Sequence, residues 1–393
     1  MKYTIAVIPG DGIGPEVTNQ AKKALEAIAD VYDHIFIFKE AQMGACAIDK
    51  TGNPLPDKTI EICKKADAIL FGAIGDPKYD NDPSAKVRPE QGLLKLRKEL
   101  GLFCNVRPVK AYEQLIDNSP LKREIIAGTD IAIYRELTGG IYFGTKEISE
   151  DGQTAFDGCS YNVEEISRIT HLAFKAAQNR RKKLTLVDKA NVLETSRLWR
   201  KVVTEIAKEY QNVQLDFLFV DNAAMQMILN PNQFDVILTE NLFGDIISDE
   251  ASVIGGSIGL LASSSIGNKS ALFEPIHGSF PQAKGKDIAN PLASILSAAM
   301  LLEHLGLHKE AKAVEQAVEK SLNLGITTED IKGKNNYSAS TSKVGDFIAD
   351  YIENQDDSQR NFFDYRTQSY LQKSQVIALA IETGWKDKGE VNE

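Results

Sequence analysis

The segment VILTENLFGDIISDE, residues 236–250, places a short apolar run directly before a helical pattern. Residues 236–238 have the length and composition of a buried strand, and apolar side chains follow them at helical spacing. Similar pairs recur along the chain. Apolar runs at 5–8 and 184–187 precede helical patterns that begin near Pro15 and Val192, and a helical pattern precedes the run at 68–71. This alternation predicts an α/β fold with a mostly parallel sheet flanked by helices.

Asp245 and Asp249 are the most informative side chains of this segment. A spacing of four places both carboxylates on one face of a helix. Two like charges repel each other there, and a partly buried carboxylate is costly without a partner, so the pair predicts a site for a hard divalent cation. The alternative is a solvated acidic face, but apolar neighbours such as Phe243 and Ile246 leave little of the helix polar.

Composition and charge narrow the class of protein. The chain has 393 residues, 43% of them hydrophobic, and a formal net charge of -10. This charge argues against nucleic acid as a partner, because phosphate binding requires a basic patch. No apolar run approaches membrane-spanning length, and the N-terminus runs straight into a strand pattern, so we predict no membrane partner and a cytoplasmic protein. The cysteines are widely spaced and are predicted to be reduced core thiols: Cys46, Cys63, Cys104 and Cys159.

Two glycine-containing segments carry further information. PGDGIGPE, residues 9–16, follows the first strand and opens a helix, but its G-x-G-x-G spacing differs from the G-x-G-x-x-G of a Rossmann fold. We therefore predict that the fold is not a Rossmann fold, and the turn is either a plain strand-to-helix connection or a cofactor wall. Residues 141–161 place glycines between aromatic and β-branched residues, which predicts an antiparallel arm of the kind that often mediates dimer contacts.

Several basic and aromatic residues are candidates for chemistry. Arg97, Arg107 and Arg135 are suited to bidentate carboxylate binding, although a single arginine is more often a surface or ion-pair residue. Tyr142 and Lys189 are acid/base candidates if burial or nearby charge moves their pKa values toward neutrality. Lys189 taken alone is ordinarily a residue at the start of a helix.

Five motifs, taken in order, resemble those of the β-decarboxylating 2-hydroxyacid dehydrogenases, the isocitrate/isopropylmalate dehydrogenase family. They are IPGDGIGPE at 8–16, RELTGGIYFG at 135–144, DKANV at 188–192, the aspartate helix, and EPIHGS at 274–279. The resemblance runs from residue 1 to about 353. It implies a cofactor-binding first domain, 1–102 with 256–355, and a second domain, 103–255, with the metal site and a dimerisation arm. It also implies a homodimer with the active site in the cleft.

The resemblance further implies roles for individual residues. Lys189 and Asp221 of one subunit complete the site of the other, and Asp221, Asp245 and Asp249 hold Mg²⁺ or Mn²⁺. A base near Lys189, acting through water or Asp221, removes the proton of the C2 hydroxyl, and Tyr142 protonates the enolate left by loss of CO2. The three arginines bind the carboxylates of the malate.

RPEQGLLKLR, residues 88–97, is similar to the substrate-recognition helix of family members that act on 3-isopropylmalate in leucine biosynthesis. The residues implied to line the isopropyl pocket are Glu90, Leu93, Leu94 and Val192. We predict oxidative decarboxylation of that substrate. The alternatives within the class are homoisocitrate, isocitrate, tartrate and malate. A catalytically silent binding or regulatory homologue is a further alternative, against which the retained acid/base and metal residues argue.

The resemblance implies a site for NAD formed by a loop and the helix start after it: His277, Gly278, Ser279, Gln282 and Asn290. Gln282 stands where the family usually has an aspartate that accepts hydrogen bonds from the adenosine ribose. A neutral amide still bonds a hydroxyl, but it does not repel a 2′-phosphate, and Lys284 could attract one. NAD is still favoured, because the lysine–tyrosine pair of NADP-using relatives is absent.

Residues 356–393 form an extension past the usual end of the family. Tyr370, Ser374, Ile377 and Ile381 recur at three- and four-residue spacing, which predicts a short amphipathic helix docked on the protein body. A disordered tail is the alternative.

Overall fold

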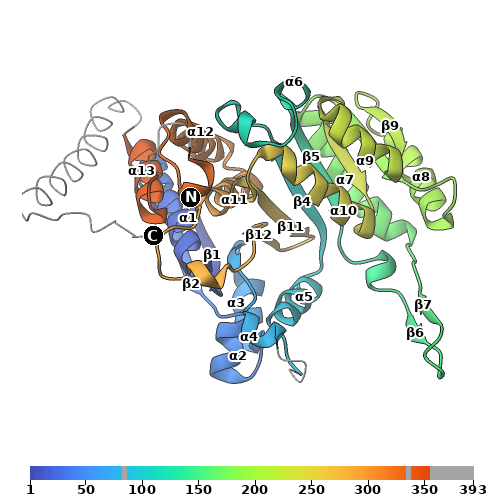
Figure 1. Cartoon of the computed structure of the whole chain (residues 1–393), viewed down its shortest axis with the longest axis horizontal. Helices are drawn as coiled ribbons and strands as arrows, with labels where there is room; N and C mark the ends of the chain where they lie inside the picture. The colour runs from blue at the N-terminus through green and yellow to red at the C-terminus, as the bar shows by residue number, and fades with distance from the viewer. Residues whose placement is uncertain (82–85, 333–337, 355–393) are drawn as a thin grey trace, which may run out of the picture.

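The computed structural model describes residues 1–81, 86–332 and 338–354. These residues form one ten-stranded sheet and one two-stranded ribbon, with helices on both faces of the large sheet (Figure 1). The amphipathic segment predicted around residues 370–381 lies outside the described residues.

The strands of the large sheet follow the order β2-β1-β3-β12-β11-β4-β5-β10-β8-β9. Six of its nine neighbouring pairs are parallel, which confirms the predicted mostly parallel sheet. The three antiparallel pairs, β12–β11, β11–β4 and β4–β5, lie together in its middle. The strand bounds are β1 Lys2–Gly10, β2 Ile35–Glu40, β3 Ala68–Ala73, β4 Leu102–Lys110, β5 Asp130–Glu136, β8 Lys183–Asp188, β9 Gln214–Phe219, β10 Val236–Thr239, β11 Ala262–Gly267 and β12 Ala271–Pro275.

Helices bury the two halves of the sheet in separate apolar clusters. In the half that contains β1, the helices α1, α11, α12 and α13 cover one face, and α3 and α5 cover the other. In the half that contains β8, α7 and α8 cover one face, and α9 and α10 cover the other. Both faces are therefore removed from water, as a parallel sheet requires, and β3 is accordingly an uninterrupted buried run. The predicted domain boundaries stay a prediction.

The α-helix bounds are α1 Gly14–Tyr32, α2 Ala45–Thr51, α3 Asp57–Lys65, α4 Pro77–Asp80, α5 Pro89–Glu99, α6 Arg123–Ile126, α7 Val163–Asn179, α8 Glu194–Ala207, α9 Val220–Leu229, α10 Asn241–Ser252, α11 Leu292–His304, α12 His308–Leu324 and α13 Thr341–Glu353. The 3-10 turns are η1 Glu113–Asn118, η2 Gly140–Tyr142, η3 Pro231–Gln233, η4 Val253–Gly255, η5 Ile258–Leu260, η6 Pro281–Ala283 and η7 Glu329–Ile331. No described helix is long and apolar enough to cross a membrane.

The predicted antiparallel arm is present. β6 (Lys146–Ile148) and β7 (Ala155–Asp157) pair as a ribbon that extends away from the body (Figure 1). Ile148 is 71% exposed and Phe156 is 56% exposed, so the ribbon carries apolar side chains that the described part of the chain leaves uncovered.

The cysteine prediction is only partly right. All four thiols are free, and Cys63 and Cys104 are buried in the core as predicted. Cys159 is exposed and Cys46 is half-buried. Cys159 follows the ribbon, which leaves the body, so no core surrounds its side chain.

Candidate active site

The site begins where β5 meets the N-terminal part of α10. Arg135, at the end of β5, is buried, and its Nε and Nη2 donate to Asn241 Oδ1 at 3.1 and 2.9 Å. Its Nη1 donates to Asp245. Gly244 makes this packing possible, because a Cβ there would lie 2.6 Å from Arg135 Cγ. Tyr142, from η2, donates its hydroxyl to Asp245 Oδ2 at 2.7 Å.

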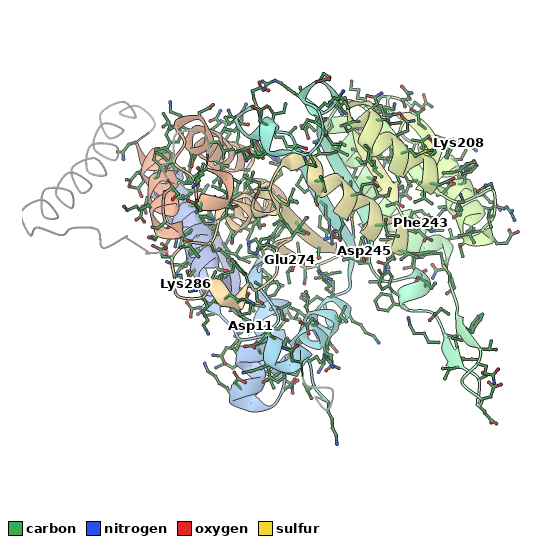
Figure 2. The ribbon with its side chains drawn as sticks, viewed as in Figure 1. Asp11, Lys208, Phe243, Asp245, Glu274 and Lys286 are labelled. Carbon is green, nitrogen blue, oxygen red and sulfur yellow. The ribbon has the colours of Figure 1, made fainter. Side chains whose placement is uncertain are left out.

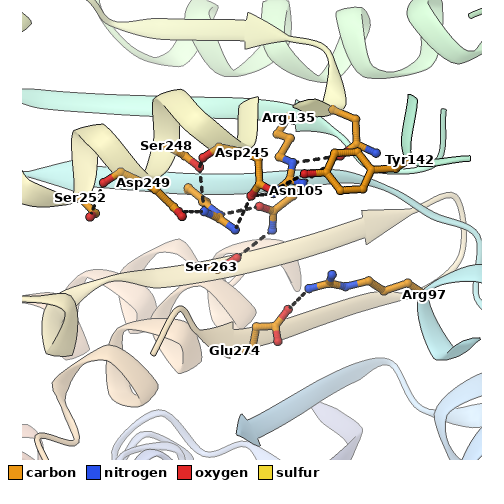
Figure 3. Close-up of polar contacts among 12 residues, drawn as sticks. Arg97, Asn105, Arg135, Tyr142, Asp245, Ser248, Asp249, Ser252, Ser263 and Glu274 are labelled. Carbon is orange, nitrogen blue, oxygen red and sulfur yellow. Dashed lines mark hydrogen bonds and ion pairs between the residues drawn. The ribbon is translucent and has the colours of Figure 1, made fainter. Parts of the chain in front are cut away.

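The second arginine holds the other aspartate. Arg107 lies in β4, and its Nη1 donates to Ser248 Oγ and to Asp249 Oδ1, both at 2.7 Å (Figure 3). Its Nε donates to Asn105 Oδ1 at 2.9 Å. The two carboxylates therefore lie on one helix face, as the spacing predicts, and each is neutralised by an arginine.

Arg97 lies on the other side of the site. It leaves α5 and donates through Nη2 to Glu274 Oε1 of β12 at 2.8 Å. Asp245 and Glu274 both lie near the middle of the molecule, on α10 and β12 respectively (Figure 2). A cavity of ≈ 180 Å³ is lined by residues of β3, α5, β4, β11 and β12, and Arg97, Arg107 and Leu93 are in its wall.

The other residues predicted for the isopropyl pocket occupy different positions. Glu90 is not among the residues that line this cavity, and its Oε1 is 3.0 Å from where a Cβ on Gly75 would be. Leu94 and Val192 are exposed, and neither is among the residues that line the cavity. Their roles remain predictions.

Lys189 and Asp221, the residues predicted to remove the C2 hydroxyl proton, are hydrogen-bonded to each other. Lys189, after β8, donates through Nζ to Asp221 Oδ1 of α9 at 2.6 Å, and this hydrogen bond lowers the pKa of the Asp221 carboxyl. The hydrogen bond to Asp245 raises the pKa of the Tyr142 phenol, so Tyr142 keeps its proton at neutral pH. In the described part of this chain no three Asp, Glu, His or Cys side chains converge on a metal position, so Asp221 does not join Asp245 and Asp249 within one subunit.

The donor set of α10 nevertheless fits a hard cation. Asp245 and Asp249 offer carboxylate oxygens on one face, and Asp249 has a side chain that is 69% exposed. Each ionised carboxylate has acceptor sites beyond those that the arginines and Tyr142 use. Oxygen donors of this kind are the ligands of Mg²⁺ and Mn²⁺, and such ions often keep several water ligands.

A second cavity, of ≈ 280 Å³, lies beside the glycine-rich turn and has mostly apolar walls. Its lining residues include Ile13, Phe280, His277, Gly278 and Asn290. His277 Nε2 is buried and has no hydrogen-bond partner in the part of the chain that the structure describes, and burial lowers the pKa of the imidazole, which is therefore neutral at pH 7. An apolar cavity with one unsatisfied ring nitrogen fits the base of a nucleotide.

Ser279 joins the turn to the loop after β12. Its carbonyl accepts the Ile13 N–H at 2.8 Å, and a Cβ on Gly12 would lie 1.9 Å from that oxygen. Glycine is thus required at position 12, and Ile13 is held in the cavity wall, which favours the cofactor-wall interpretation of the turn. Gln282, in η6, is exposed and is not among the residues that line the cavity.

The sequence profile described as isocitrate/isopropylmalate dehydrogenase matches residues 4–348. A 3-isopropylmalate dehydrogenase of Bacteroides fragilis is 52% identical over 352 residues, which are 90% of this chain and 99% of that protein. The chain belongs to the isocitrate/isopropylmalate dehydrogenase family. A 3-isopropylmalate dehydrogenase of Clostridium pasteurianum is 55% identical over 89% of this chain and 99% of its own length. The crystal structure of isocitrate dehydrogenase from Methylococcus capsulatus superposes with a TM-score of 0.78 at 34% identity, over 89% of this chain and 99% of that one.

Sequence reasoning missed several residues of this family site. Asn105 and Asn241 are buried partners of the arginines, and Glu274 pairs with Arg97. Asn105 could have been predicted from the sequence. It precedes Arg107 by two residues, and residues two apart on a strand lie on the same face. Asp330 lines the second cavity and accepts from Asn290 at 3.0 Å, but no motif marks it in the sequence.

Proposed function

We propose that this chain is an NAD- and Mg²⁺- or Mn²⁺-dependent 3-isopropylmalate dehydrogenase that catalyses the oxidative decarboxylation step of leucine biosynthesis. The observation that carries the proposal is the ≈ 180 Å³ cavity in which the apolar Leu93 accompanies Arg97 and Arg107. Guanidinium groups suit the two carboxylates of a malate, and an apolar side chain beside them suits an alkyl group at C3. The relatives at 52% and 55% identity support the same substrate.

The charges of the site support an exchange of partners on substrate binding. Arg107 and Arg135 now neutralise Asp249 and Asp245. A divalent cation held by these aspartates would release the guanidinium groups for substrate carboxylates, so that charge stays paired throughout. When bound, the cation supplies Lewis-acid stabilisation of negative charge on the substrate oxygens.

The proton-transfer groups are assigned by their chemistry. Lys189 and Asp221 form a charged pair that takes the proton of the C2 hydroxyl while hydride leaves C2 for the cofactor. Tyr142 remains protonated next to Asp245 and delivers the proton that replaces the lost carboxyl group. The neutral His277 and the apolar walls of the second cavity would hold the adenine of NAD.

The active unit in this proposal is a homodimer. Lys189 and Asp221 are hydrogen-bonded to each other, and among the described residues Asp221 belongs to no group of three possible metal ligands, so the pair would complete the site of a second subunit. Apolar side chains that a partner could cover are exposed on α9, α10 and the ribbon: Met225, Leu229, Ile246, Ile148 and Phe156. Patches of this kind on a folded chain mark association surfaces.

A substrate panel tests the proposal. Purified protein is assayed with 3-isopropylmalate, homoisocitrate, isocitrate, tartrate and malate, each with NAD or NADP and with Mn²⁺ or chelator. We expect the highest kcat/KM for 3-isopropylmalate with NAD, because burying a branched alkyl group contributes roughly 1–3 kcal/mol. Asp245→Asn should abolish metal-dependent turnover. A higher kcat/KM for isocitrate, or turnover that persists in chelator, would contradict the proposal.

A further inference from the structure

A buried asparagine connects Arg107 to the neighbouring strand. Asn105 is 2% exposed and lies on β4 two residues before Arg107. Its Oδ1 accepts from Arg107 Nε at 2.9 Å, and its Nδ2 donates to Ser263 Oγ at 2.8 Å and to the Ser264 carbonyl at 3.0 Å (Figure 3). All three hydrogen bonds of this amide are therefore made to residues at the site or on β11.

The orientation of this amide is fixed by chemistry. A guanidinium group only donates, and a backbone carbonyl only accepts. The Asn105 oxygen must therefore face Arg107 and its nitrogen must face Ser264, so a flipped amide would lose both contacts. Arg107 Nε is held at one angle, and its terminal nitrogen Nη1 is directed at Ser248 and Asp249.

The same pair of strands fixes a second arginine. Ser263 lies opposite Glu274 in the β11–β12 pair, and Glu274 binds Arg97. Asn105, Ser263 and both arginines line the same ≈ 180 Å³ cavity. Strand β11 thus connects the supports of two guanidinium groups, from α5 and from β4, that face one space.

We propose that Asn105 is a positioning residue for Arg107, which it holds by Nε so that the terminal nitrogens of the guanidinium meet a substrate carboxylate. The inference rests on the proposed function only for the identity of the ligand, a C3-substituted malate. Asn105 itself stabilises the free and the bound enzyme alike. Its loss should weaken ground-state and transition-state binding equally, because both states use the same arginine.

The first test is Asn105→Ala, measured with whichever malate of the substrate panel the wild type prefers. We expect KM for the malate to rise roughly 10- to 100-fold, the effect of losing one charge-assisted hydrogen bond, while kcat and the KM for the cofactor change by less than about threefold. Thr170→Val is the matched control, because Thr170 is also buried and loses one hydrogen bond, to the Ile166 carbonyl. The control should lower the melting temperature and leave KM unchanged.

A double-mutant cycle separates positioning from direct contact. In an Arg107→Ala background, Asn105→Ala should change KM by less than about twofold, because the group that Asn105 holds is gone. Multiplicative effects of the two substitutions on KM would overturn the inference, as would an unchanged KM in Asn105→Ala.

If Asn105→Ala does not fold, Ser263→Ala tests the inference instead. That variant removes one of the bonds that orient the amide, and we expect KM to rise by roughly two- to fivefold only while Arg107 is present. Calorimetric binding of malate to each variant gives the same comparison without turnover.

Discussion

Glu240 is a buried carboxyl group immediately before the helix that carries the aspartates. Burial, and then the charge of Glu136, raises its pKa to about 7, and its Oε2 has no hydrogen-bond partner among the described residues. The folded protein therefore holds a proton on Glu240 that the unfolded chain releases near pH 4.5. Glu240 therefore lowers the free energy of unfolding progressively as pH rises from about 4.5 to 7, and the full loss is present above pH 7.

Glu240→Gln should remove this cost. The amide has nearly the same shape and never ionises, so we expect the variant to gain about 1–3 kcal/mol of unfolding free energy at pH 8 and close to nothing at pH 4.5. Chemical denaturation of both proteins at the two pH values measures it. A gain of equal size at both pH values would show that the carboxylate charge is not the cause.

Gln282 sets the expected cofactor preference. We predict that NAD is preferred, with a smaller margin over NADP than a carboxylate at position 282 would give. Gln282→Asp should widen the NAD/NADP ratio of kcat/KM by about tenfold, because it adds a charge that repels the 2′-phosphate. Gln282→Asn is the neutral control. An unchanged ratio in the aspartate variant would mean that the side chain at position 282 does not face the ribose. Gln282 is exposed and does not line the cavity, so this outcome is the alternative.

At the scale of elements, the β6–β7 ribbon has too few residues to bury its own apolar side chains. A two-stranded ribbon is at most marginally stable by itself in water, so from the exposed Ile148 and Phe156 we predict contact with a second subunit. Ile148→Asp combined with Phe156→Asp should convert the proposed dimer to monomer and reduce turnover. The control Gln153→Asp adds one negative charge, half of that in the double variant, in the exposed turn of the ribbon between the strands, and should leave the proposed dimer intact. Sedimentation velocity measures the outcome, and a dimer that persists in the double variant would place the interface elsewhere.

At the scale of the whole molecule, a site shared between subunits allows two inactive proteins to restore each other. Lys189→Ala and Asp245→Asn should each be nearly inactive as homodimers. Their heterodimer contains one site with both defects and one site with neither. Co-expression in equal amounts should therefore recover about a quarter of wild-type turnover, since half of the dimers are mixed and half of their sites are intact. The control pair is Arg107→Ala with Asp245→Asn. Each active site takes both of these residues from one and the same subunit, so each site of the control heterodimer carries one defect. Recovery in the control pair, or none in the test pair, would contradict the shared site.

Much of the architecture can be predicted from local patterns in the sequence. The apolar runs before Pro15 and Asn241 became β1 and β10, because buried strands of a parallel sheet need continuous apolar side chains. The four-residue spacing of Asp245 and Asp249 placed both on one face of α10, since helix geometry depends only on neighbours along the chain. The glycine spacing at 10–14 likewise differs from that of a Rossmann turn, which is a purely local feature of the sequence.

The partners of the charged side chains were decided by tertiary structure alone. Arg107 and Asp249 are far apart in the chain, and Asn105 meets Ser263 only because the antiparallel strands β11 and β4 lie side by side in the middle of the sheet. The antiparallel centre of the sheet, the exposure of Cys159 and the cavity role of Asp330 have no local sequence signal for the same reason. A periodic sequence pattern determines which face of a helix or strand is buried. Which side chains meet across that face depends on how the helices and strands pack, and that packing depends on the whole chain.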